Sequence, residues 1–93
     1  MKVKLNDEEC VDLEKMELVK TEEYSGVSIY VTKNTRRFFK FYPAGTRSEH
    51  AEIEEMNYIF DVRDFVIKYC DNVDEINDLI NYFNLGEQLT EVE

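Results

Sequence analysis

Residues 27–42 read VSIYVTKNTRRFFKFY and contain two runs of β-branched and aromatic residues. In the first run, 27–32, apolar residues alternate with serine, tyrosine and threonine; the second run occupies 37–42. Alternation is typical of strands, and the asparagine-containing turn between the runs favours an antiparallel hairpin. The stretch therefore predicts a β-hairpin around which the rest of the fold is arranged.

The sequence before the hairpin is less regular. Residues 1–5 alternate apolar and basic side chains, as a short strand would. The spacing of apolar residues favours a short helix from about Asp7 to Met16, with 17–23 as a further candidate strand. Segments 7–23 and 49–60 both stay open between helix and strand.

The sequence after residue 60 predicts two helices, over about 62–70 and 73–84, because apolar residues recur there at helical spacing. Asp61 is the expected cap of the first helix, and Asp71 and Asn72 are candidate caps of the second. Gly86 is the expected stop of the second helix. Each helix has a single apolar face, so both must dock on another element.

The predicted fold class is therefore α+β. An antiparallel hairpin or meander of 27–42, to which 1–5 and 17–23 would add strands, packs against the C-terminal helical pair. With 93 residues we expect one domain over 1–93, with a frayed tail at 87–93.

Composition narrows the class of protein. Two cysteines, sixty residues apart, favour free thiols over a disulfide scaffold, and no apolar run is long enough to cross a membrane. We therefore expect a cytoplasmic protein without a membrane partner, which would work in the host cytoplasm if a phage encodes it.

Charge is sorted into blocks along the chain. Residues 24–48 hold five bases and no acid, whereas 49–93 hold thirteen acids and two bases within a total of −10. Such a layout bears on partners more than on fold. It also predicts a homo-oligomer in which the basic block of one copy meets the acidic half of another.

Signatures of enzymes and cofactors are lacking. The three glycines stand apart, and His50 is the single imidazole. His50 and Glu52 match half of a zinc deaminase signature, but the cysteine half is missing. Cys10 and Cys70 have no spacing typical of a zinc site. We therefore predict a protein that is not an enzyme and that uses no metal or cofactor.

Carboxylates in the second half are the predicted partner-binding residues. Rows of exposed acids on a helix resemble the phosphate spacing of DNA in order of magnitude, so a basic nucleic-acid-binding groove could accept either. The expected partner is thus a basic protein surface, with no direct binding of DNA. The predicted contact residues are Glu52, Glu55, Asp71, Asp74, Glu75 and Asp78.

Two other interpretations remain open. The chain could be a structural or regulatory partner, such as an immunity protein, an antitoxin or an assembly subunit, bound through Tyr30, Phe38 and Tyr42 on the face opposite Ile29 and Phe39. Alternatively, bases and aromatics of the hairpin between Lys33 and Tyr42 could bind single-stranded RNA.

In size, charge and element order the chain resembles the small acidic inhibitors of phages, anti-CRISPR proteins among them. The hairpin 27–42 and the acidic helical segments 62–70 and 73–84 carry this resemblance. It implies a non-enzymatic blocker of a nucleic-acid-binding nuclease complex, and it implies no role for any single residue.

Overall fold

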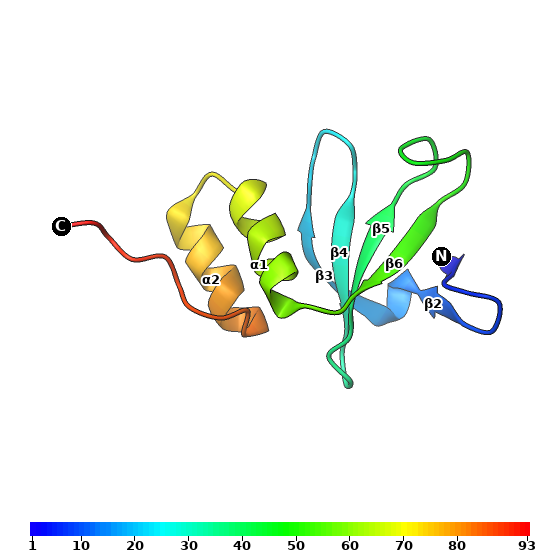
Figure 1. Cartoon of the computed structure of the whole chain (residues 1–93), viewed down its shortest axis with the longest axis horizontal. Helices are drawn as coiled ribbons and strands as arrows, with labels where there is room; N and C mark the ends of the chain where they lie inside the picture. The colour runs from blue at the N-terminus through cyan, green and yellow to red at the C-terminus, as the bar shows by residue number, and fades with distance from the viewer.

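A computed structural model describes residues 1–93, the whole chain (Figure 1). Its elements follow the order β1 (Lys2–Lys4), β2 (Cys10–Asp12), the 3₁₀ turn η1 (Leu13–Lys15), β3 (Met16–Thr21), β4 (Ser28–Thr32), β5 (Phe38–Tyr42), β6 (Glu52–Met56), α1 (Ile59–Lys68) and α2 (Val73–Phe83).

The central element is a four-stranded antiparallel meander in the order β3-β4-β5-β6. The predicted hairpin 27–42 supplies β4 and β5, and the candidate strands at 1–5 and 17–23 correspond to β1 and β3. Together with the two C-terminal helices, this arrangement confirms the predicted α+β class. The segment 49–60, left open by the sequence, contributes the edge strand β6.

Both faces of the meander are covered. Val31 lies opposite Phe38 in the register of β4 and β5, and Tyr30 lies opposite Phe39. Side chains that face each other across two strands point to the same side of a sheet. The expectation that Ile29 and Phe39 share one face is therefore wrong, because Ile29 points to the helical side with Phe38.

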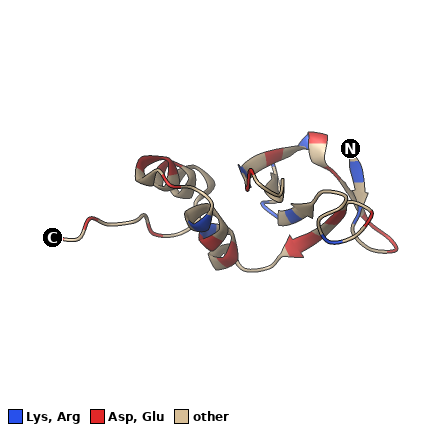
Figure 2. Ribbon diagram, turned by 90° about the horizontal axis from the view of Figure 1, so that it is seen from above, with Lys and Arg blue, Asp and Glu red and all other residues tan.

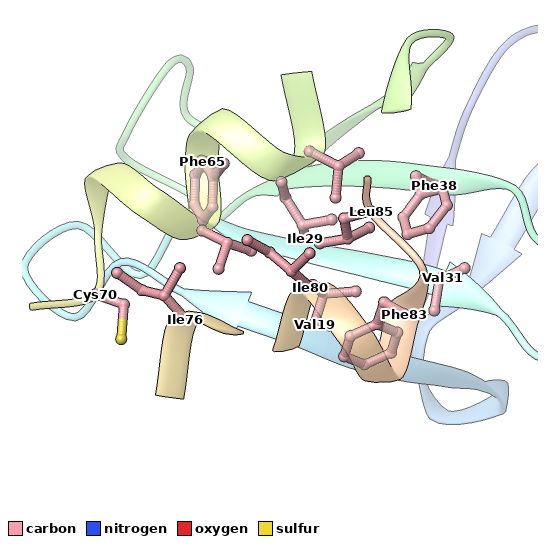
Figure 3. Packing of buried hydrophobic residues seen from close by; sticks show 12 residues of the cluster. Val19, Ile29, Val31, Phe38, Phe65, Cys70, Ile76, Ile80, Phe83 and Leu85 are labelled. Carbon is pink, nitrogen blue, oxygen red and sulfur yellow. The ribbon is translucent and has the colours of Figure 1, made fainter. Parts of the chain in front are cut away.

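The larger core lies between the meander and the two helices (Figure 3). The sheet contributes residues such as Ile29 and Phe38, and the helices contribute residues such as Val66 and Ile80. Ile29, Val66 and Ile80 are fully buried. Burial of each such side chain stabilises a fold by about 1.5–3 kcal/mol, so this contact fixes the position of the helical pair.

A second, smaller core lies on the opposite face of the meander. Val3 of β1 packs there with Phe39, Phe41 and Ile53. The expected helix over 7–16 is wrong, because Cys10–Asp12 form β2, which pairs with β1 in a small hairpin, and Leu13–Lys15 form the 3₁₀ turn η1. Val11 of β2 and Leu13 of η1 pack against this core, and Met16 of β3 does the same.

α1 begins three residues and ends two residues before its predicted bounds, whereas α2 begins at the predicted residue and ends one residue early. Tyr58, and not Asp61, is the N-cap of α1, and Asp61 lies in the first turn. Asn72 caps α2 as predicted, because its side chain accepts the Glu75 N–H at 2.9 Å. Asn84, in the left-handed conformation, ends α2 in place of Gly86.

The segment after α2 remains attached to the helices for several residues. Leu85 is buried in the larger core, and the Leu89 N–H donates to Asn77 Oδ1 at 2.8 Å. Neither α1 nor α2, with 10 and 11 residues, has the length and apolar character required to cross a bilayer.

Candidate docking surface

Four of the six predicted partner-binding residues gather at the start of α2. Asp71 lies in the turn before the helix, Asp74 and Glu75 lie in its first turn, and Asp78 follows one turn later. All four are exposed. Glu75 alone has an internal counter-charge, since its Oε1 lies 3.4 Å from Lys20 Nζ of β3.

Glu52 and Glu55 occupy a different part of the molecule, on β6. Strand alternation directs them to opposite faces of the sheet. Arg37 binds Glu55 through two hydrogen bonds, of 3.0 and 2.7 Å, which lower the pKa of the Glu55 carboxyl. Glu52 lies 3.5 Å from Arg47. The structure therefore does not bring the six residues into one surface, because α2 and β6 lie toward opposite ends of the molecule, with α1 and the other strands of the sheet between them (Figure 1).

The bases of the hairpin are engaged within the molecule. Arg36 Nη2 donates to the carbonyl oxygens of Phe83 and Asn84, at 2.9 and 2.7 Å, at the C-terminal end of α2. A cation at this end also interacts favourably with the helix dipole. Arg36 adopts a φ of 56°, so the hairpin turn accepts a left-handed residue to make this contact.

Two further bases belong to an aromatic and acidic cluster near the end of β5. Arg47 stacks over the Tyr42 ring, with its guanidinium carbon 4.2 Å from the ring centroid. Both Tyr42 and Arg47 bind Glu54, at 2.7 and 3.2 Å, and these contacts, Tyr42 first, lower the pKa of Glu54. Lys40 lies over the rings of Tyr42 and Phe65. Of the five bases in 24–48, Lys33 is the one without such a contact.

The acids of the helical pair, in contrast, have few counter-charges. Residues 57–93 contain nine acids and two bases, a balance of −7. Figure 2 shows acidic positions along both helices, while most basic positions lie in the half that holds the sheet. Five exposed aspartates of this half make no ion pair, and we call them the acidic helical surface: Asp61, Asp64, Asp71, Asp74 and Asp78.

A groove runs between α1 and the β5–β6 side of the sheet, with a volume of about 530 Å³. Asp61 and Asp64 of α1 line one wall, and Glu54 and Glu55 of β6 line the other. Lys40 and Lys68 also line the groove, so acids outnumber bases by four to two. The sequence did not reveal this groove, because it depends on how α1 returns toward the edge strand.

Two exposed aromatic residues lie at the start of α1, and one of them, Tyr58, also lines the groove. Tyr58 and Phe60, on either side of the α1 start, are 71% and 63% exposed. The three aromatic residues that the alternative interpretation assigned to an apolar interface are less exposed to solvent. Phe38 belongs to the larger core, Tyr30 packs against the smaller one, and Tyr42 is covered by Arg47.

The two cysteines differ in solvent exposure and lie in different parts of the molecule. Cys10 is exposed on β2, and Cys70 is buried in the larger core. The structure contains no group of three histidine, cysteine, aspartate or glutamate side chains arranged to hold a metal ion.

Comparison with protein-family models, with curated proteins and with solved structures found no match to this chain.

Proposed function

We propose that this protein is a non-enzymatic interaction protein, an inhibitor of the anti-CRISPR type, whose acidic helical surface docks on a basic nucleic-acid-binding partner. One observation supports the proposal: most bases of residues 24–48 have partners within the chain, but the aspartates of the acidic helical surface have no counter-charge. Four of the five bases in residues 24–48 contact acids, carbonyls or aromatic rings of the same chain, whereas the five aspartates of the acidic helical surface have no ion pair.

This difference favours a basic protein surface over a nucleic acid as the ligand. Binding of nucleic acid by the hairpin would require Arg36 and Arg37 to leave partners at hydrogen-bond distance. Docking of a basic surface on the aspartates requires no such rearrangement. Charge complementarity of this kind supplies fast encounter and specificity.

We place the proposed partner-binding residues on the helical pair alone. Glu52 and Glu55, paired with Arg47 and Arg37, would have to exchange one counter-charge for another. Asp61 and Asp64 take their place in the proposal, because both are exposed and free of ion pairs. Asp71, Asp74 and Asp78 remain as the part proposed from the sequence.

Affinity capture with matched charge variants tests the proposal. Wild-type chain is immobilised and exposed to a nuclease-treated lysate of cells that carry the gene. The test variant reverses Asp71→Lys, Asp74→Lys and Asp78→Lys. The control variant makes the same change in net charge at other exposed positions, Glu8→Lys, Glu9→Lys and Glu49→Lys.

We expect a basic nucleic-acid-binding protein to be retained by the wild type and by the control, and to be lost by the test variant. It should elute between about 0.05 and 0.5 M salt, because exposed charge pairs are screened. Equal retention by both variants, or retention of no such protein, would refute the proposal. Circular dichroism verifies that all three chains are folded.

A further inference from the structure

The outer edge of β6 presents backbone groups that nothing in the chain binds. β6 pairs with β5 alone, and no other segment makes a backbone hydrogen bond to residues 52–56. An unpaired edge of this kind is a template for the addition of another strand. The opposite edge of the sheet, β3, differs, because its register is broken by a bulge between Leu18 and Lys20.

The register identifies which groups point outward. The Thr32 N–H donates to the Arg37 carbonyl at 3.0 Å, so these residues form a hydrogen-bonded pair across β4 and β5. Pairs of this type alternate along antiparallel strands. Continued across β5, the alternation leaves the N–H and C=O groups of Ile53 and Glu55 on the free edge.

The charges beside this edge favour a basic segment as the strand that would bind there. Glu54 and Glu55 of β6 and Asp61 and Asp64 of α1 line the groove between α1 and the β5–β6 side of the sheet. Lys40 and Lys68 also line it, so acids outnumber bases there, and the two aspartates have no ion pair. A second copy paired through its own β6 would set glutamates against glutamates, which is unfavourable. A strand rich in lysine and arginine would instead meet opposite charges.

We infer that an extended basic segment of the partner adds as an antiparallel strand to β6, with its cationic side chains in the groove beside Asp61 and Asp64. This inference builds on the proposed function and names how that partner is held. Because successive side chains of a strand point to opposite faces, the inference also predicts the order of apolar and basic residues in the bound segment. Residues paired directly with Ile53 and Glu55 lie on the side of the smaller core and should be apolar, and the intervening residues should be basic.

Two isomeric peptides test this geometry. The probe is a synthetic peptide of about nine residues in which valine alternates with lysine or arginine. One isomer carries N-methyl groups on its valines, whose N–H groups should face β6. The other carries the same number on its basic residues, whose N–H groups should face away. Both have the same composition and charge, so Coulomb attraction does not distinguish them.

We expect the isomer methylated on its basic residues to bind the full chain about tenfold or more tightly than the other, because only it retains the strand hydrogen bonds. Its binding should protect the amide protons of Ile53 and Glu55 from exchange, as seen by NMR. Asp61→Asn with Asp64→Asn should weaken this binding, and Glu8→Gln with Glu49→Gln, at exposed residues without ion pairs outside the acidic helical surface, serves as the matched control.

Equal affinity of the two isomers, the absence of binding, or unprotected Ile53 and Glu55 amides would overturn the strand-addition inference. None of these results would remove the proposed function, because docking through charge alone requires no pairing with β6. Failure of the capture experiment with the Asp71, Asp74 and Asp78 variant would refute that function instead.

Discussion

Arg37 and Glu55 illustrate how single residues set the free charge of this surface. Their two hydrogen bonds cross from β5 to β6 and lower the pKa of Glu55 below its ordinary value of 4.5. A carboxylate held in this way is satisfied within its own chain. Glu55 therefore contributes less to the attraction of a partner than Asp61 or Asp64, which have no such neighbour.

The lowered pKa of Glu55 predicts a pH-dependent contribution to stability. The folded chain holds the Glu55 proton more weakly than the unfolded chain, so the pair stabilises the fold above pH 4.5 and this contribution is lost as the pH falls below that value. Glu55→Gln should lower the urea midpoint at neutral pH, and its difference from wild type should narrow on acidification. Glu49→Gln, at an exposed residue without an ion pair, is the control. A gap that does not change with pH would contradict this role.

At the residue scale the sequence predicted little of this pattern. Asn72 could be predicted as a cap, because its acceptor and the Glu75 N–H are local to one turn. The partners of Arg36 lie 47 and 48 residues away along the chain. Which bases are neutralised internally therefore depends on tertiary contacts that no local pattern encodes.

The contact of Arg36 with α2 joins two elements, the β4–β5 turn and the end of a helix. Arg36→Ala should lower the free energy of unfolding by about 1 kcal/mol, because it removes hydrogen bonds to the last carbonyls and a favourable interaction with the dipole. Lys33→Ala, in the same turn but without such a contact, should change it by less than about 0.5 kcal/mol. Urea unfolding measures both. Equal effects of the two substitutions would show that the contact does not stabilise α2.

Elements with a clear period were predicted, and elements without one were not. β4, β5 and the two helices follow the alternation and the helical spacing of their apolar residues. β1 lies in the alternating stretch 1–5 that was expected as a strand, whereas β2 has three residues, too few to show a period. β6 reads EIEEM, which favours a helix by composition, yet pairing with β5 and burial of Ile53 make it a strand.

At the scale of the whole molecule, most bases of residues 24–48 are bound within the chain, whereas most acids of the helical half face solvent. The bases lie mostly in the half that holds the sheet, and the helical half, residues 57–93, has a net charge of −7. The predicted self-association through the basic block stays a prediction, and it would have to compete with the contacts of Arg36 and Arg37. A basic partner meets no such competition at the helices.

Competition for nucleic acid on the captured partner tests the central claim most directly. Fluorescence anisotropy follows a labelled nucleic acid bound to that partner while the unlabelled chain is added. We expect the wild type and the Glu8, Glu9 and Glu49 variant to displace the nucleic acid, and the Asp71, Asp74 and Asp78 variant to leave it bound. A ternary complex of partner, nucleic acid and wild-type chain would contradict the account, because both ligands would then occupy separate surfaces.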